Sequence, residues 1–232
     1  MTLAIMQPYF MPYLGYYKLL NAVDKFVIYD DVNFINRGWV NRNKILVGGK
    51  EHLFTIPLQN ASQNKLIYEV QLSPGVAWRK KLLKTIDQSY RKAPHYETVF
   101  PLLEDIINDP SEDIAAYCRQ SLAKTADYLA IETEIIPTSR HYGNSELKGQ
   151  ERILDICQKE TADHYINPIN GQSLYDKTLF AKEGITLSFI KRTPEVYPQF
   201  KNEFVPWLSV IDALMFNSVA EMQESLQAFE LI

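Results

Sequence analysis

Two adjacent carboxylates, Asp30 and Asp31, follow an apolar run at 26–29. Successive side chains of a strand point to opposite faces, so we expect one carboxylate to face a site and the other to cap a turn or pair with an arginine. A carboxylate at the end of a strand can act as a general base, a metal ligand or an acceptor for a hydroxyl group. An acidic turn without chemistry is the alternative interpretation.

The segment 7–17 carries two prolines, one glycine and four tyrosines. Prolines stiffen a loop, and a glycine relieves its backbone. Such a loop can offer backbone N–H groups to an anion and aromatic faces to a sugar or a base, whereas a tightly packed turn is the competing interpretation. The candidate binding residues of this segment are Gln7, Pro12, Tyr13, Gly15 and Tyr16.

Two pairs of residues could hold the negative charge of a substrate. Asn41 and Arg42 combine an amide with a guanidinium, which suits a phosphate or a carboxylate. Lys148 and Arg152 are four residues apart, so a helix would place them on one face near its start. Cations are unfavourable at a helix N-terminus unless an anion lies nearby, which predicts a bound phosphate. A plain surface pair is the alternative.

Later segments add a tyrosine, an acid and a histidine. Tyr175 and Asp176 open a predicted helix, where the helix dipole by itself also favours an acidic residue. His141 follows a predicted strand and is a candidate general acid or base. The four histidines and two cysteines lack the spacing of a zinc site, so no metal held by protein ligands is expected. The cofactor stays open, and Mg²⁺ is expected if the substrate is a nucleotide.

The elements that must position these residues alternate between strands and helices. Apolar runs predict buried strands at 3–6, 25–29, 134–136, 164–166 and 185–190, and helical patterns are predicted at 15–22, 147–159, 173–183 and 208–216. This order predicts an α/β protein with a parallel, Rossmann-like sheet that is covered on both faces. Ligands of such sheets bind beyond the carboxyl ends of the strands.

Two parts of the chain depart from this alternation. Gly48-Gly49 between two apolar runs predicts a small β-hairpin region, and a further short strand is predicted at 67–72. From Ala77 to Leu129 the pattern is helical, and Pro94, Pro101 and Pro110 are expected to divide it into several helices. We therefore expect a single α/β domain over 1–232, with 77–129 as a helical insertion within it.

Composition excludes several classes of protein. The chain has 232 residues, 46% of them apolar, and a formal net charge of −4. These values are typical of a globular protein, and without a basic run a dedicated nucleic-acid binder is not expected. Two cysteines are too few for a disulfide framework. The apolar start lacks a basic n-region and no long uncharged apolar run follows, so we expect a cytoplasmic protein without a membrane span. The oligomeric state is not determined.

Several separated motifs resemble the WbqC-like protein family. They are Ala4–Tyr17, Asp30–Phe34, Trp39–Asn43, Glu151–Cys157, Tyr165, Gly171, Tyr175-Asp176, Phe180, Gly184-Ile185, Tyr197–Phe200 and Ser209–Asn217. The resemblance implies a bacterial protein associated with O-antigen, lipopolysaccharide and other surface polysaccharides, with a role in modifying an activated sugar. The site candidates that it carries over are Gln7, Pro12, Gly15, Tyr16, Asp30, Asp31, Asn41, Arg42, Arg152, Tyr175 and Asp176.

A second resemblance concerns layout. Nucleotidyltransferases of the class I synthetase type carry a His-x-Gly-His motif after the first strand, and Tyr13-Leu14-Gly15-Tyr16 is similar in position and keeps the glycine. Both histidines are replaced by tyrosine, so the adenylyl transfer that depends on them is not expected here. A nucleotidyltransferase-like fold with different chemistry remains compatible with the residues.

Three functions follow from these patterns. The first is a transferase that acts on a nucleotide sugar or a phosphorylated small molecule in polysaccharide biosynthesis. The second is a nucleotidyltransferase-like enzyme that uses ATP or CTP. The third is a binding or scaffold protein of glycan assembly without catalysis, for which Phe200, Phe204, Trp207 and Leu208 could form an apolar contact patch.

Overall fold

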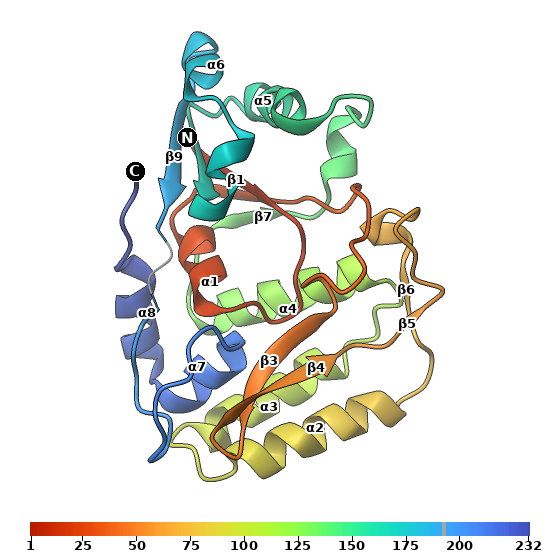
Figure 1. Cartoon of the computed structure of the whole chain (residues 1–232), viewed down its shortest axis with the longest axis vertical. Helices are drawn as coiled ribbons and strands as arrows, with labels where there is room; N and C mark the ends of the chain where they lie inside the picture. The colour runs from red at the N-terminus through yellow and green to blue at the C-terminus, as the bar shows by residue number, and fades with distance from the viewer. Residues whose placement is uncertain (192–193) are drawn as a thin grey trace.

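A five-stranded parallel sheet forms the centre of the computed structural model, which describes residues 1–191 and 194–232 (Figure 1). Its strands run in the order β7-β2-β1-β8-β9. Their bounds are β1 Thr2–Met6, β2 Lys25–Ile28, β7 Glu134–Ile136, β8 His164–Pro168 and β9 Thr186–Ile190. The predicted α/β class and the five predicted strands are therefore confirmed.

Alternation along the strands divides the interior into two cores. Ala4 of β1 lies in one core, whereas its neighbours Leu3 and Ile5 lie in the other. In β2, Phe26 belongs to the first core and Val27 to the second. Every second side chain thus points to the same face, and both faces need a covering layer because both are apolar.

Helices supply the two layers. The first core receives side chains from α1 (Leu14–Asn21), α4 (Ile114–Tyr128), α7 (Val210–Phe216) and α8 (Val219–Gln227). The second core receives them from α5 (Gly149–Lys159) and α6 (Lys177–Lys182). Among residues 1–191 and 194–232, no helix is long and apolar enough to cross a membrane.

The helical segment predicted at 77–129 consists of α2 (Ala77–Tyr90), α3 (Tyr96–Ile107) and α4. Pro101 does not divide it, because this proline lies inside α3. The helix continues through Pro101 since Val99 and Leu103 on either side of it are fully buried. Their contacts with the core offset the hydrogen bond that a proline removes.

The helices share a core with the rest of the chain. The ring of Tyr117 in α4 stacks on Phe10, which follows β1, with 4.9 Å between the ring centroids. The Sγ of Cys118 lies 3.4 Å from the carbonyl oxygen of Val40. Helix α4 therefore packs against the loop that follows β1 (Figure 1).

The predicted hairpin is confirmed as β3 (Arg42–Val47) and β4 (Lys50–Thr55). Gly48 and Gly49 form its turn with φ values of 59° and 77°, a conformation that favours glycine. A second, shorter hairpin pairs β5 (Leu58–Gln59) with β6 (Gln71–Leu72). The strand predicted at 67–72 is thus present at its end alone, because Ile67–Glu69 form a 3₁₀ turn whose Glu69 side chain accepts from the backbone N–H of Leu66.

The helix predicted at 173–183 begins later than expected. Residues Ile169–Leu174 form a 3₁₀ helix, and α6 starts at Lys177. Asp176 is the N-cap of α6, since its carboxylate accepts from the N–H of Thr178 at 2.8 Å. A capping side chain of this kind fixes where a helix begins. Gly184 follows the helix with φ of 73°, as predicted for a C-terminal glycine.

The order in which the chain adds strands to the sheet changes direction at β1, the central strand. From β1 the chain adds β2 and then β7 on one side, and afterwards β8 and β9 on the other. The connections leaving β1 and β8 therefore diverge at the carboxyl edge of the sheet. Such a switch point leaves a crevice where open α/β sheets bind their ligands.

Candidate functional site

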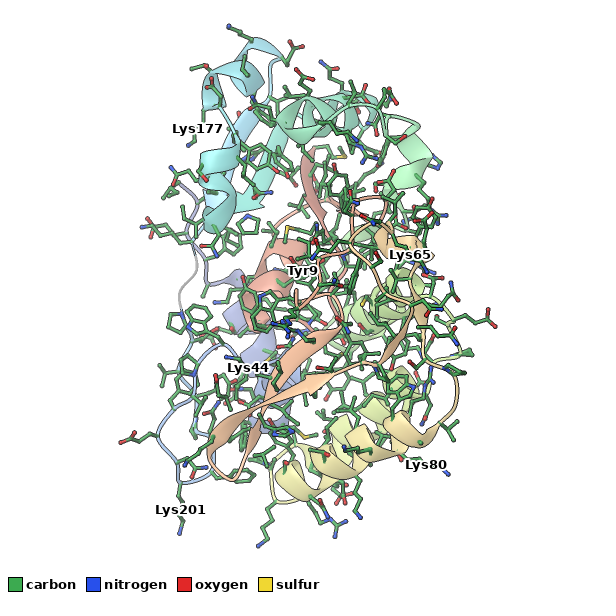
Figure 2. The ribbon with its side chains drawn as sticks, turned by 45° about the vertical axis from the view of Figure 1, so that its right-hand side comes forward. Tyr9, Lys44, Lys65, Lys80, Lys177 and Lys201 are labelled. Carbon is green, nitrogen blue, oxygen red and sulfur yellow. The ribbon has the colours of Figure 1, made fainter. Side chains whose placement is uncertain are left out.

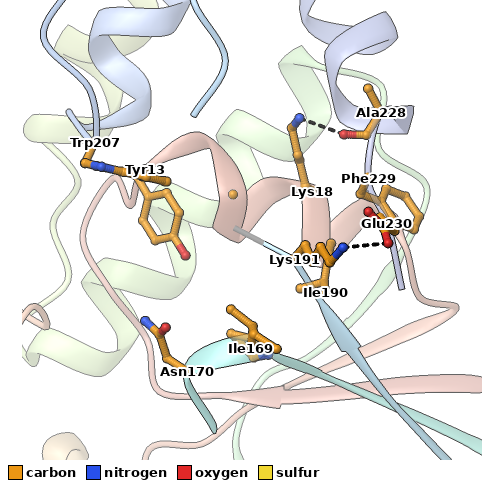
Figure 3. Close-up of a pocket in the computed structure, with 12 residues that line it drawn as sticks. Tyr13, Lys18, Ile169, Asn170, Ile190, Lys191, Trp207, Ala228, Phe229 and Glu230 are labelled. Atoms are coloured by element: carbon orange, nitrogen blue, oxygen red, sulfur yellow. Dashed lines mark hydrogen bonds and ion pairs between the residues drawn. The ribbon is translucent and has the colours of Figure 1, made fainter. Parts of the chain in front are cut away.

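A pocket lies at this switch point (Figure 3). The start of α1 forms one wall, the residues after β8 and β9 form the opposite side, and two later segments complete the rim. The lining residues are Tyr13, Gly15, Lys18, Pro168, Ile169, Asn170, Ile190, Lys191, Trp207, Ala228, Phe229 and Glu230. Two of the predicted binding residues, Tyr13 and Gly15, thus lie in the pocket. Trp207 was predicted for an apolar contact patch and not for a ligand site.

Both lysines of this pocket contact the segment 228–230 (Figure 3). The Nζ of Lys18 donates to the carbonyl oxygen of Ala228 at 2.8 Å and lies 3.1 Å from a carboxylate oxygen of Glu195. The Nζ of Lys191 lies 2.7 Å from the carboxylate of Glu230, in a pair whose side chains are 44% and 63% exposed. The exposed pair exchanges easily with solvent or with an anion, because surface ion pairs contribute less than about 1 kcal/mol.

A second polar cluster follows β2 and β7 at the same edge of the sheet. Asp30 is buried, and its Oδ1 accepts from the hydroxyl of Thr138 at 2.7 Å and from the backbone N–H of Ser139 at 3.2 Å. Its Oδ2 lies 3.7 Å from Nε of Arg140. Burial raises the pKa of Asp30 above its ordinary value, against the lowering effect of Thr138 and Arg140. This carboxylate is therefore a stronger base than an exposed one.

Asp31 is held by a buried arginine. One carboxylate oxygen of Asp31 lies 2.5 Å from Arg152, and the other accepts from the hydroxyl of Ser139. Arg152 also donates through Nε to Asn144 at 2.9 Å. The side chains of Asp31 and Arg152 are 6% and 3% exposed, so each is the charge that makes burial of the other tolerable. The anion expected beside Arg152 is thus present within the protein as Asp31.

Tyr29 packs against this cluster, and Tyr175 packs against Tyr165. The guanidinium carbon of Arg152 lies 4.9 Å from the ring centroid of Tyr29, and burial raises the pKa of the Tyr29 phenol. Tyr175 packs edge-on against Tyr165 at 5.8 Å between centroids. Sequence analysis did not assign Tyr29 a role, although its place directly before Asp30 at the end of a strand was a signal that could have found it.

Several predicted binding residues make contacts with the backbone, two of them at the loop after β1 and two around β3. The hydroxyl of Tyr16 donates to the backbone carbonyl of Gln7 at 2.8 Å, and the carbonyl of Pro12 accepts from the N–H of Val210 at 2.9 Å. The side chain of Asn41 donates to the carbonyl of Ile56 at 2.8 Å, and Arg42 donates through Nε to the carbonyl of Gly38 at 3.1 Å. These contacts are structural, because they join backbone segments to one another.

Three predicted residues lie at the surface. His141 is exposed, with its ring 5.9 Å from that of Tyr142. Lys148 is exposed and donates to the carbonyl of Ser145 at 3.1 Å, so it does not share the buried position of Arg152. Asp176 is exposed and serves as the N-cap of α6. In Figure 2, Lys80, Lys177 and Lys201 likewise point outward at well-separated places.

A third buried network holds the segment that carries Trp207. The carboxylate of Asp212 in α7 accepts from Tyr90 at 2.8 Å, from Tyr197 at 2.8 Å and from Gln199 at 2.6 Å. Asp212 is fully buried, and burial raises its pKa despite these donors. The network therefore ties the segment that leads to Trp207 onto α7 and α2.

Over residues 1–191 and 194–232, no group of three or more histidine, cysteine, aspartate or glutamate residues is placed to hold a metal ion. The two cysteines are buried. Burial raises the pKa of Cys157 to about 12, so this thiol behaves as a small apolar side chain.

Comparison with known proteins shows the family. A model of the WbqC-like protein family matches residues 7–224. The chain belongs to the WbqC-like protein family. The match begins directly after β1 and ends inside α8. It includes the Asp30 cluster, the Asp212 network and the pocket except for its lining residues Ala228, Phe229 and Glu230.

A protein of Mycobacterium tuberculosis (strain ATCC 25618 / H37Rv), described as uncharacterized, is 28% identical over 226 residues, which cover 97% of this chain and 96% of the relative. The similarity therefore extends over the whole fold. No solved structure matches the chain significantly.

Proposed function

We propose that this WbqC-like protein is a cytoplasmic transferase that acts on a nucleotide-activated or phosphorylated sugar in the biosynthesis of surface polysaccharide. The observation that carries the proposal is that the switch-point pocket and the buried Asp30 carboxylate both lie at the carboxyl edge of one parallel sheet. The association with O-antigen and other surface polysaccharides that the resemblance to this family implies supports a sugar as the substrate.

The strand order supports a nucleotide or phosphorylated ligand. Numbered along the chain, the five parallel strands have the order 3-2-1-4-5, which is that of a Rossmann-like sheet. Phosphates bind such sheets at the start of the helix after the first strand, where N–H groups and the helix dipole favour an anion. Here that helix is α1, whose first turn contains no acidic residue.

Asp30 is the better proton acceptor of the two carboxylates. Both oxygens of Asp31 are engaged, by Arg152 and by Ser139. Within residues 1–191 and 194–232, Oδ2 of Asp30 accepts no hydrogen bond and has Arg140 at 3.7 Å. In the proposed reaction, Oδ2 takes the proton of an acceptor hydroxyl or amine. The acceptor's electron pair forms the new bond to the sugar, and the bond from the sugar to the leaving phosphate breaks.

Thermal unfolding with candidate ligands tests the binding. The panel contains UDP-glucose, GDP-mannose, dTDP-glucose, ATP, CTP and acetyl-CoA, each with and without Mg²⁺. A ligand at a hundred times its Kd stabilises by about 2.7 kcal/mol, which corresponds to about 5–11 °C in a chain of this size. A shift with nucleotide sugars supports the proposal, and a panel without any shift contradicts it.

Asp30→Asn tests the role of the carboxylate. The amide keeps an oxygen that can accept from Thr138, so the variant should bind the ligand found in the panel and lose at least about 100-fold in turnover. Asp127→Asn removes an exposed carboxylate of α4 and serves as the control. Full turnover by Asp30→Asn would contradict the assignment.

A nucleotidyltransferase-like enzyme is the second candidate. The same strand order and the glycine at position 15 favour it. It would require Mg²⁺ with ATP or CTP and would release pyrophosphate, which the first candidate does not. A Mg²⁺-dependent thermal shift with ATP or CTP, followed by pyrophosphate release, would place this candidate first.

A scaffold protein of glycan assembly is the third candidate. It is supported by the exposed aromatic side chains of Phe200 and Trp207, which are 41% and 37% exposed. A scaffold would show no thermal shift with the panel. It would instead lose binding to its protein partner when Phe200 is replaced by serine.

A further inference from the structure

The ring of Tyr13 forms one wall of the switch-point pocket. Tyr13 is the N-cap of α1, and Figure 3 shows its hydroxyl directed toward the centre of the pocket, opposite Lys191 and Glu230. The backbone around it is fixed, because Tyr13 forms a β-bridge with Ser209. The side chain of Ser209 in turn donates to the carbonyl of Met11 at 2.6 Å.

Gly15 makes room for this ring. A Cβ atom built on Gly15 would overlap Cε2 of Tyr13 and would lie 3.2 Å from Cδ2 and Cζ of the same ring. The φ angle of Gly15 is not in the left-handed region, so the backbone conformation does not itself require glycine. Glycine also disfavours a helix relative to alanine. The tyrosine ring that lies over the first turn of α1 is therefore the physical reason for a glycine at this position.

Trp207 supports the other side of the ring. Its ring lies edge-on to Tyr13 with 6.0 Å between centroids and an angle of 78° between the planes. Trp207 has φ of 62°, a left-handed conformation that is uncommon for a bulky residue. Such strain persists where the surroundings enforce it, and here the Asp212 network anchors the preceding segment through Tyr197 and Gln199.

We propose that Tyr13 contacts the sugar or phosphate of the ligand directly, and that Gly15 and Trp207 are positioning residues that hold its ring in the pocket. This inference rests on the proposed function. A phenol ring offers an apolar face to the pyranose of a nucleotide sugar, and its hydroxyl donates to a sugar or phosphate oxygen. Lys191 on the opposite side supplies a positive charge when its exposed pair with Glu230 opens.

A double-mutant cycle separates this role from damage to α1. The variants are Tyr13→Ala, Gly15→Ala and the two together, with binding of UDP-glucose, GDP-mannose and dTDP-glucose measured by calorimetry. Tyr13→Ala should weaken binding of the recognised nucleotide sugar about tenfold or more, and Gly15→Ala should weaken it by a similar factor by displacing the ring. In the Tyr13→Ala background, Gly15→Ala should change the affinity by less than about twofold, because the two residues act through one ring.

Further variants identify which part of Tyr13 acts. Tyr13→Phe keeps the ring and removes the hydroxyl, so its loss of affinity should be smaller than that of Tyr13→Ala. Trp207→Ala should weaken binding of the nucleotide sugar when Tyr13 is present and have little effect when Tyr13 is already replaced by alanine. Tyr128→Phe, which changes a half-buried tyrosine of α4, is the matched control and should bind as the unaltered protein does.

The outcomes are distinguishable from failure of the proposed function. If the unaltered protein binds none of the three nucleotide sugars, both proposals are rejected. If it binds one and Tyr13→Ala binds it equally well, the role of Tyr13 is rejected and the proposed function stands. If Gly15→Ala weakens binding equally in both backgrounds, Gly15 acts through α1 and its role in positioning the ring is rejected.

Discussion

Replacing Arg152 by methionine should destabilise the fold strongly, because it leaves a buried carboxylate without its counter-charge. The guanidinium of Arg152 lies 2.5 Å from Asp31, with both side chains almost inaccessible to water. Methionine fills a similar volume but offers no donor. After the change, the carboxylate of Asp31 keeps the hydroxyl of Ser139 as its partner.

The size of the effect follows from the burial of this pair. Removing one partner of a buried ion pair costs about 3–5 kcal/mol. In a chain of this length, that corresponds to a decrease of about 6–20 °C in Tm. The double variant Arg152→Met/Asp31→Leu removes both charges and should recover much of the lost stability, since well-packed apolar side chains can replace a buried pair.

Urea unfolding followed by circular dichroism measures these differences. Lys159→Met is the matched control, because Lys159 lies on the same helix and pairs with Asp155 at 2.8 Å while its side chain is 45% exposed. The control should lose less than about 1 kcal/mol. If Arg152→Met loses no more than the control, or if the double variant is less stable than Arg152→Met, the reasoning about burial is wrong.

Three further predictions concern stability. Burial raises the pKa of Asp212, so its carboxyl group binds a proton more tightly in the folded chain than in the unfolded chain. This group therefore stabilises the fold most below its ordinary pKa of about 3.9, and its contribution is lost as the pH rises through the raised pKa. Asp212→Asn should remove this part of the pH dependence of the urea midpoint. Tyr197→Phe removes the hydroxyl that donates to the Asp212 carboxylate at 2.8 Å and should lower the free energy of unfolding in urea by about 1.5–3 kcal/mol. An unchanged free energy of unfolding would contradict a hydrogen bond to a charged carboxylate. Gly49→Ala should cost about 1–2 kcal/mol in the same assay, because φ is 77° in the hairpin turn, whereas an unchanged midpoint would exclude strain there.

Local patterns in the sequence were sufficient for most of the elements. Apolar runs located the five strands, since strands covered on both faces must be apolar throughout. The Gly48-Gly49 pair located the hairpin because few other residues adopt its backbone angles. Two boundaries were predicted wrongly: Ile67–Glu69 form a 3₁₀ turn where a strand was expected, and α6 begins later than expected. Side-chain caps such as Asp176 decide these boundaries.

The sequence also selected residues of the site without revealing their partners. Asp30, Asp31, Arg152, Tyr13 and Gly15 were each predicted from their type and position. Asp31 and Arg152 are 121 residues apart, and folding alone brings them into contact. Arg152 was predicted to contact a phosphate of the substrate, whereas in the structure it forms an ion pair with Asp31. The reason is physical: a guanidinium that the fold buries must find its counter-charge within the protein.

The pocket itself is a product of tertiary structure. Its walls come from the start of α1, the residues after β8 and β9, the position of Trp207 and the segment 228–230. The order of strands in the sheet sets where these segments meet, and that order depends on long-range packing that no local pattern encodes. The sequence by itself thus determined the type of each element and the candidate chemical groups. The tertiary structure decided which of those groups line the same pocket. The reason is that contacts between segments distant in the sequence form only when the two cores pack against the two faces of the sheet.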